Sequence, residues 1–376
     1  MLLQVAWRIL VDQKGRTALA AGGIFIAILL VFIELGFFVA VPQGGMLIYD
    51  HMRFDLLVCS NRYLFQAQSG QFPLARLAAA RTVAEVAQAS PVYLGAAKWQ
   101  DANGGLRVDT SIIAIDPPAG VFAVPDIERQ SAVLERPDTV LVDGASRSLF
   151  GLLRPGRVVD IAGRKMTIGG VYTLGTGFLG LGVVLASEAN FFRMFPERPP
   201  DMVNLGLVSL KPGADPDRVA QALRAIFPAD TQVFTRPELV AHEVAYWTTR
   251  TATGLIFGSG LVISFVVGIM VLYQTLATQI TRQLPQFATL KAIGYTDRYL
   301  DGIVLIESFL ITAVAFVPAL GAALGVYALV RSETLLPLAL TVPQLGTVFA
   351  ITLVMAAASA FLSLGGLRRA DPAEVF

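Results

Sequence analysis

The sequence contains very few of the residues that build catalytic and metal sites. It holds one cysteine, Cys59, and two histidines, His51 and His242, which lie far apart in the chain. A single cysteine excludes a disulfide within the chain, and two distant histidines argue against a histidine-built metal site or a Ser-His-Asp triad. The motifs G-x-x-x-x-G-K-[ST], H-E-x-x-H and G-x-S-x-G are absent from the sequence. We therefore expect a chain that is not an enzyme and that has no catalytic, cofactor-binding or metal-binding residues.

Charged residues are also scarce. They make up 15% of the chain against 55% hydrophobic residues, and the mean hydropathy is +0.62, which is too apolar for an ordinary soluble protein. A net charge of +1 argues against a nucleic-acid-binding protein. The segments 251–281, 308–330 and 334–367 hold no Asp, Glu, Lys or Arg, and 17–41 holds only Glu34. Since about 20 apolar residues cross a bilayer as a helix, these segments predict four transmembrane helices.

The roughly 200 residues between the first and second of these segments have ordinary soluble composition, with strand-like and helix-like stretches. The predicted fold class is a membrane protein with four transmembrane α-helices (1+3) and a large external α+β domain inserted between the first and second. Within the domain, 116–138 reads as a long loop between two lobes. A helix that begins at Thr235 is expected to run through Trp247 straight into the second span.

These observations divide the chain into nine segments. They are an N-terminal segment at the membrane surface (1–16), transmembrane helix 1 (17–41), the external α+β domain (42–250), transmembrane helix 2 (251–277), a cytoplasmic coupling helix and loop (278–302), transmembrane helix 3 (303–330), a short external loop (331–343), transmembrane helix 4 (344–364) and a cytoplasmic tail (365–376).

Lys and Arg in the short loops predict the orientation in the membrane. The segments 1–16 and 278–302 hold three each and 365–376 holds two, whereas 331–343 holds only Arg331. Because positively charged loops stay in the cytoplasm, both termini and the coupling segment are expected there, with the large domain outside.

The first apolar segment has two interpretations. A cleavable signal peptide is one, but the segment is much longer than the roughly 7–15 apolar residues of such a peptide, which favours a retained span. Glu34 lies near the outer end of that span. It is either a carboxylate that reaches the interface or hydrogen-bonds within the helix bundle, or an intramembrane polar site that contacts a substrate or a proton.

The polar interruption between the second and third spans is the segment best placed to receive force from a soluble partner. A short amphipathic helix is expected over 279–297, with Gly294 as its stop. Its apolar residues are expected to fill a groove on that partner while two cations orient the contact, and Phe287→Ala is expected to uncouple the two proteins. The alternative is that the apolar residues rest on lipid headgroups. The predicted coupling residues are Arg282, Leu284, Phe287, Leu290 and Lys291.

The second span carries small residues at four-residue spacing: Gly260, Ser264 and Gly268. Such a face permits close helix contact. It predicts either a seam between two copies of the chain or ordinary packing within one copy.

Several motifs together resemble one family. The chain resembles DevC-type permeases of ABC exporters, within the wider group that includes the MacB, LolC and FtsX membrane proteins. The resemblance spans nearly the whole chain and its motifs are LPQFATLKAIGYTD (284–297) with Glu307, DPAEVF (371–376), PDTVLVD (137–143) followed by Ser146 and Arg147, GGVYTLG (169–175) and NFFR (190–193). The chain departs from the family at Gln286, where an acid is usual, and it lacks the nucleotide-binding domain that is fused to MacB.

The resemblance implies a homodimeric permease in a bacterial inner membrane, with the large domain in the periplasm. It would be driven by a separate ABC ATPase, which would bind ATP and Mg²⁺ in place of this chain. It also implies a periplasmic membrane-fusion protein and a TolC-like outer-membrane channel as partners, and a lipid-like or amphiphilic substrate. One alternative is an FtsX-like device that activates an external enzyme without transport. A membrane-anchored receptor or enzyme is another, which the lack of a catalytic constellation disfavours.

Overall fold

The computed structural model describes residues 14–102, 104–175, 180–334 and 338–369. The chain divides into two compact units. One, here called the inserted domain, comprises Pro42–Arg250, and the other, the helical unit, comprises Met1–Val41 and Thr251–Phe376. The terminal motif 371–376 and most of the segment 1–16 lie outside the described residues.

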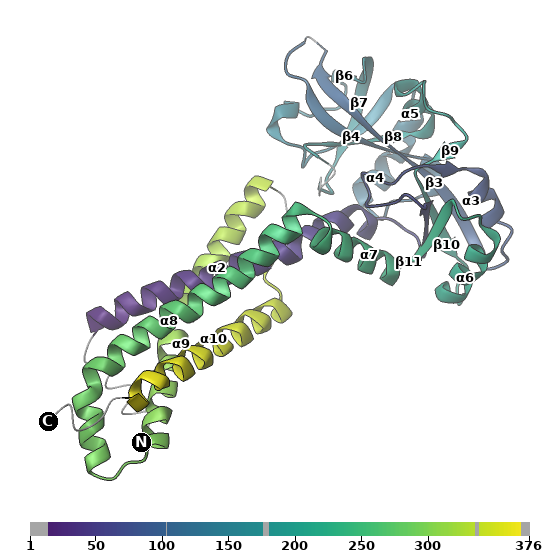
Figure 1. The fold of residues 1–376 in the computed structure, drawn as a ribbon. Helices are drawn as coiled ribbons and strands as arrows, with labels where there is room; N and C mark the ends of the chain where they lie inside the picture. The colour runs from purple at the N-terminus through teal and green to yellow at the C-terminus, as the bar shows by residue number, and fades with distance from the viewer. Residues whose placement is uncertain (1–13, 103, 176–179, 335–337, 370–376) are drawn as a thin grey trace. The chain divides into compact units, whose positions relative to one another are not determined.

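The inserted domain is an α+β domain (Figure 1). Its strands are β1 (Leu56–Ser60), β2 (Phe72–Pro73), β3 (Val86–Asp101), β4 (Val108–Ile115), β5 (Thr139–Asp143), β6 (Val158–Ile161), β7 (Arg164–Tyr172), β8 (Val183–Ser187), β9 (Met202–Val203), β10 (Leu205–Leu210) and β11 (Thr231–Thr235). Its helices are α3 (Ala75–Ala80), η1 (Pro117–Ala119), α4 (Pro125–Gln130), η2 (Ser131–Glu135), η3 (Ser148–Phe150), α5 (Glu188–Met194), α6 (Pro216–Ile226) and α7 (Arg236–Thr249).

The long strand β3 organises this domain. Within the described residues, nine strands form one sheet in the order β11-β1-β10-β3-β4-β8-β5-β7-β6, and β6 also pairs with β3. The first half of β3 pairs with β10 as far as Val92, and its end pairs with β6 from Trp99 onward. Six strands therefore close a ring, in the order β3-β4-β8-β5-β7-β6 and back to β3. The other three strands, β10, β1 and β11, extend the sheet from the first half of β3.

Three strands of the sheet are short apolar runs. All five residues of β1, β5 and β8 are buried, which is typical of strands covered on both faces. Two apolar clusters lie on the two sides of the sheet, one including Trp99 and Phe150 and the other including Tyr49 and Leu239. The segment expected as a loop at 116–138 instead contains η1, α4 and η2, because Ile127 and Leu134 are buried in the second cluster.

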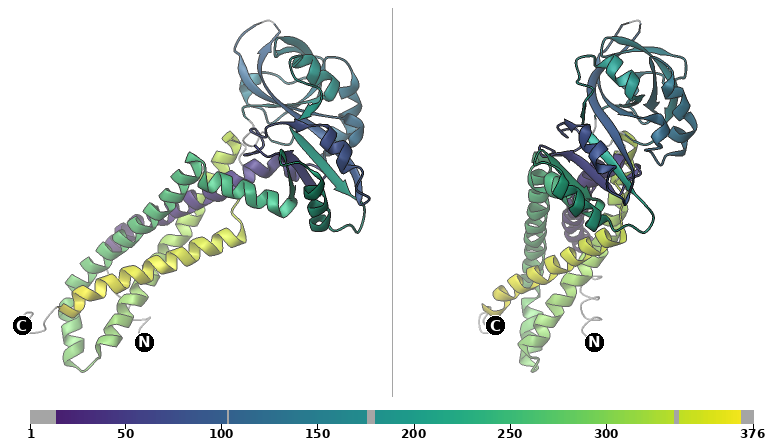
Figure 2. Two further views of the ribbon diagram at one scale, coloured as in Figure 1. Left: turned by 45° about the vertical axis from the view of Figure 1, so that its right-hand side comes forward. Right: turned by 90° about the vertical axis from the view of Figure 1, so that its right-hand side faces the viewer.

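The helical unit contains α2 (Lys14–Asp50, which extends into the inserted domain), α8 (Ala252–Ala292), α9 (Asp297–Thr334) and α10 (Val342–Arg369). Four helices in the described residues are long and apolar enough to cross a membrane. They share an apolar cluster that includes Ile28, Leu272, Ile311 and Met355, and the views of Figure 2 show them running lengthwise beside one another. The predicted fold class, with one span, an inserted α+β domain and three further spans, is confirmed.

Serine hydroxyl groups form hydrogen bonds between neighbouring spans. Ser308 Oγ on α9 donates to Ala356 O on α10 at 2.9 Å. Ser359 Oγ on α10 shares its proton between Met355 O of its own helix, at 2.8 Å, and Ile269 O on α8, at 3.0 Å. Hydrogen bonds of this kind commonly hold transmembrane helices together.

The expected continuous helix from Thr235 into the second span is wrong. Thr235 does begin α7, through a capping box with Glu238, but α7 ends at Thr249. Thr251 then caps α8, because its Oγ1 accepts a hydrogen bond from Gly254 N at 3.1 Å. A helix cap needs a residue with extended backbone, and Thr251 has φ −110° and ψ 150°, so the two helices are separate.

Candidate functional site

The predicted coupling segment is not a separate short helix. It forms the last part of α8, which continues to Ala292 with Pro285 inside it. The chain then reverses over residues 293–296 and begins α9 at Asp297. Gly294 has φ +106°, a left-handed conformation that glycine adopts easily. We call residues 293–296 the α8–α9 turn.

Contacts within the chain hold this turn in one shape. Tyr295 N donates to Leu290 O at 3.1 Å, and Lys291 Nζ forms a 2.8 Å ion pair with Asp297. The rings of Tyr295 and Tyr299 lie 4.6 Å apart. Lys291, which was predicted to orient a partner, therefore has a partner inside the chain.

The predicted anchor Phe287 is also an internal residue. It is only 4% exposed and packs in a cluster with Leu276, Ile280, Leu300 and Ile303. The prediction that it fills a groove on the ATPase is therefore wrong. The aromatic ring instead joins the end of α8 to the beginning of α9.

The helical period separates the apolar residues of this segment. A helix turns about 100° per residue, so apolar residues spaced by exactly three drift by about 60° at each step. Leu284 and Ile293 therefore lie on opposite sides of α8. The truly buried face has spacings of three and four, through Ile280, Gln283 and Phe287, whereas Leu284 is only half-buried.

The exposed face of this part of α8 comprises Arg282, Gln286, Thr289 and Ile293, at spacings of four, three and four. Ile293 is 70% exposed. We call these four residues the α8 end face. It is an amphipathic surface of one cation, two polar side chains and one apolar side chain.

A polar pair lies on the internal side of the same segment. Glu307 on α9 is 1% exposed, and Gln283 on α8 hydrogen-bonds its carboxyl group. Glu307 is therefore buried between the two helices. It joins α8 to α9 close to Phe287.

Two other predicted sites come together in the structure. A Cβ atom on Gly260 would overlap with the carboxyl group of Glu34, so the glycine makes room for this acid. Gly268 likewise lies against Met355 and Ala27. With Ser264 also buried, at 4% exposed, the small-residue face is used for packing within the chain, which is the second of the two interpretations of this face.

The inserted domain holds a buried acid that the sequence did not single out. Glu243 on α7 is fully buried, accepts a hydrogen bond from Trp247 Nε1 at 3.0 Å and accepts another from the Tyr63 hydroxyl. The Tyr63 hydroxyl lies 2.8 Å from that of Tyr49. Burial raises the pKa of Glu243 to about 7, and the two hydrogen bonds oppose this rise. One sequence signal could have indicated that Glu243 is buried. It lies four residues after the apolar Leu239, and so on the same face of the helix.

Two family models match the chain and together cover most of it. The MacB-like periplasmic core domain matches residues 17–226, and the FtsX-like permease C-terminal model matches residues 258–372. A single span, an inserted α+β domain and three further spans are the architecture of a membrane permease subunit. The chain belongs to the MacB/FtsX-like permease family, whose members are non-catalytic transmembrane subunits of ABC systems and partner ABC ATPases.

Three solved structures are similar to part of the chain. The periplasmic region of MacB from Actinobacillus actinomycetemcomitans is 10% identical, with 48% of this chain and 88% of that chain covered and a TM-score of 0.35. The extracellular domain of the noncanonical ABC-type transporter YknZ from Gram-positive bacteria is 12% identical, with 48% and 99% covered and a TM-score of 0.33. A domain of a permease from Porphyromonas gingivalis is 17% identical, with 49% and 87% covered and a TM-score of 0.34. No curated protein matches the chain significantly.

The family places the inserted domain on the periplasmic or extracellular side of a multi-pass membrane protein. α8 follows that domain in the chain and is long enough to cross a membrane once.

Proposed function

We propose that the chain is a DevC-type permease subunit of an ATP-driven tripartite exporter. It transmits force from a separate cytoplasmic ATPase to its periplasmic domain, and ATP and Mg²⁺ are bound by that ATPase. Its further partners are a membrane-fusion protein and a TolC-like outer-membrane channel. The substrate is lipid-like or amphiphilic, a class consistent with spans that carry almost no ionisable groups.

The observation that carries this proposal is the α8 end face. It is accessible and is continuous with the second span, while the adjoining turn joins that span to the third. The charge of the short loops predicts that this end of the span lies in the cytoplasm. Phe287 and the Gln283–Glu307 contact fasten α8 to α9 just behind it. A displacement of this face therefore moves both spans together.

The ATPase contact is expected at Ile293, with Arg282 as a charge at its rim. An apolar side chain that fills a partner's pocket contributes much more to binding than a rim charge does. This assignment replaces the internal Phe287 as the anchor. It retains Arg282 from the residues predicted by sequence.

Because Gly260, Ser264 and Gly268 pack within the chain, a homodimer would need another contact surface. The second span is the least buried of the four, with 17% of its most apolar window inside the chain. Its free face carries Leu255, Val262, Ile263, Val266 and Met270, which are 44–71% exposed. We propose that a second copy packs on this face.

The function is tested by co-expressing the chain with an ABC ATPase and a membrane-fusion protein from the same genome. Lipid-like molecules released into the medium are then compared between the active ATPase and one whose phosphate-binding lysine is replaced. ATP-dependent release supports export. Activation of a cell-wall hydrolase with no released lipid would contradict it and support a signalling device.

A further inference from the structure

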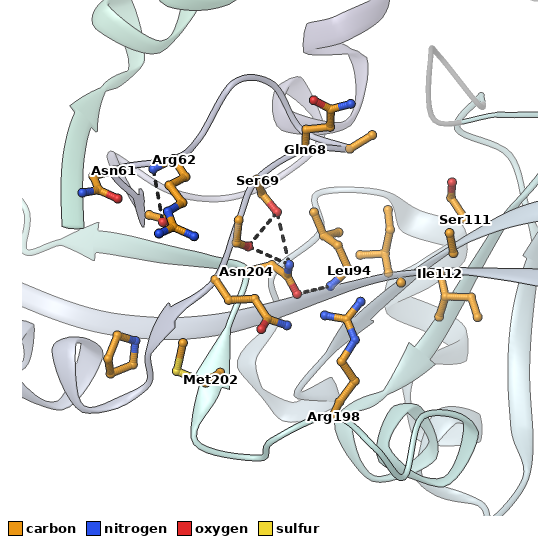
Figure 3. A pocket seen from close by; sticks show the side chains of 18 of the residues that line it. Asn61, Arg62, Gln68, Ser69, Leu94, Ser111, Ile112, Arg198, Met202 and Asn204 are labelled. Atoms are coloured by element: carbon orange, nitrogen blue, oxygen red, sulfur yellow. Dashed lines mark hydrogen bonds between the residues drawn. The ribbon is translucent and has the colours of Figure 1, made fainter. Parts of the chain in front are cut away.

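The inserted domain contains an open pocket of about 770 Å³. Its walls come from the segment after β1, from the middle of β3 and β4, and from the residues around β9 (Figure 3). This volume is within the range of roughly 300–1,000 Å³ that is typical of ligand sites. The pocket lies wholly inside one unit of the chain.

Strand β3 has an unpaired stretch of backbone in the floor of this pocket. Its pairing with β10 ends at Val92 and its pairing with β6 begins at Trp99, while β4 lies along its other edge throughout. Leu94 N, on the open edge, donates to the Asn204 side-chain Oδ1 at 2.9 Å. Farther along, Lys98 O accepts from Ala162 N at 3.2 Å.

Ala96 lies between these two contacts and points the same way. Alternate residues of an antiparallel strand direct both their N–H and C=O groups to the same edge, so Ala96 shares the open edge with Leu94 and Lys98. Its neighbour on β4, Ser111, directs its N–H away toward Gly182 O at 3.0 Å. Among the residues that the structure describes, the N–H and C=O of Ala96 therefore have no partner strand.

The pocket also has uncompensated positive charge. Arg62 and Arg198 both line it, and in the view of Figure 3 they flank Asn204. In the part of the chain described by the structure, neither guanidinium has an ion-pair or hydrogen-bond partner. The acid in the lining, Asp230, is already paired with Arg76 at 3.1 Å. Two free guanidinium groups favour a carboxylate or another planar anion.

Asn204 holds the two sides of the pocket together. Its amide donates to Gly70 O at 2.9 Å and to Ser69 Oγ at 3.2 Å, while its oxygen accepts from Leu94 N. Asn204 is buried and therefore a fixed part of the site. The free edge is bounded by this side chain at one end and by β6 at the other.

We propose that the pocket binds a short extended peptide segment that carries a carboxylate. The segment pairs with Ala96 as an added strand, and its carboxylate binds Arg62 and Arg198. The edge from Val92 to Trp99 spans about 24 Å at about 3.4 Å per residue, so it admits only a few residues. This inference does not depend on the proposed export function, because a periplasmic partner and an exported polypeptide would present the same chemistry.

A free backbone donor and acceptor in one residue distinguish a peptide from a lipid. An anionic lipid headgroup would use the two arginines but would leave the Ala96 edge unpaired. An extended peptide uses both features, and the half-buried Leu94 and Met202 offer apolar surface to its side chains.

The test uses the full chain in phosphatidylcholine nanodiscs. The probe is a fluorescent pentapeptide library of alternating valine and threonine ending in glutamate with a free C-terminus, and the comparison library ends in glutamine amide. Binding is measured by fluorescence anisotropy. We expect saturable binding of the first library and at least about tenfold weaker binding of the second, since each charge-assisted contact is worth about a factor of ten.

Variants separate the two features of the site. Arg62→Gln with Arg198→Gln should weaken the glutamate library at least about tenfold and leave the amide library unchanged. Ala96→Pro removes the unpaired N–H without breaking a hydrogen bond between strands, since proline is tolerated at a free edge, and should weaken both libraries. Arg136→Gln with Arg154→Gln removes the same charge from exposed positions outside the pocket and should change neither.

Three results would overturn the proposal. The first is no saturable binding of either library, and the second is equal binding by all variants. The third is that lysophosphatidylglycerol displaces the peptides, and that its binding is weakened by the two arginine substitutions but not by Ala96→Pro. The last would assign the pocket to an anionic amphiphile. The thermal unfolding midpoint of each variant shows whether it is folded.

Discussion

Replacing Glu243 by glutamine should change how the stability of the inserted domain depends on pH. The carboxyl group is fully buried, and burial raises its pKa from 4.5 to about 7. In the unfolded chain the group returns to its ordinary pKa, so the folded state binds more protons than the unfolded state between these two values. The contribution of this group to the free energy of unfolding is therefore fully present below pH 4.5 and is lost as the pH rises through 7.

The magnitude follows from the same values. A difference of about 2.5 pKa units corresponds to about 3 kcal/mol between pH 4.5 and pH 8. For a domain of this size, 1 kcal/mol moves the unfolding midpoint by roughly 2–4 °C. The unfolding midpoint of Glu243→Gln minus that of the wild type should therefore rise by about 6–12 °C between pH 4.5 and pH 8.

The assay is thermal unfolding of the full chain in detergent, followed by tryptophan fluorescence, because the Trp247 indole donates to Glu243. Glu188→Gln is the matched control, since Glu188 also accepts a hydrogen bond from a tyrosine hydroxyl, that of Tyr93, at 2.9 Å but is only half-buried. It controls for the loss of a tyrosine–carboxylate contact. A difference between wild type and Glu243→Gln that stays constant with pH would refute the reasoning.

Three further predictions follow from the packing and the layout. Phe287→Ala should lower the unfolding midpoint of the helical unit, because it leaves a cavity worth roughly 3–5 kcal/mol in a closed cluster; an unchanged midpoint in detergent would show that the ring is not packed. A reporter fused after Phe376 or inserted near Tyr295 should read cytoplasmic, and one near Gly104 should read external; a cytoplasmic reading at Gly104 would overturn the topology. The inserted domain, residues 42–250, should fold when expressed alone, as circular dichroism and a cooperative melt would show, whereas an unfolded product would mean that it depends on the spans.

The spans and the inserted domain could be predicted from the sequence because both depend on composition over many residues. Stretches such as 251–281 have no charged side chain, and a bilayer selects for that directly. The orientation of single side chains at the end of α8 could not be predicted in this way. Phe287 and Ile293 are both apolar, and only the packing of α9 determines which of them is internal.

The remaining sites depend on contacts between distant segments. The partners of Glu243 include Tyr63, 180 positions away, and the pocket joins residues near Arg62, Ala96 and Arg198. Local sequence patterns carry no information about such pairings. The break between α7 and α8 was missed because Thr251 reads equally well as a helix interior residue and as a helix cap.

The central claim is that the α8 end face transmits force from the ATPase, and the affinity of the ATPase for the permease tests it most directly. The permease in nanodiscs is titrated with the purified ATPase, with Leu152→Ala as the control, since Leu152 is 68% exposed against 70% for Ile293 but lies in the inserted domain. Losing an apolar anchor of about 2 kcal/mol should weaken binding by Ile293→Ala about thirtyfold, with an unchanged unfolding midpoint, while Leu152→Ala binds as the wild type. Wild-type affinity in Ile293→Ala would contradict the claim.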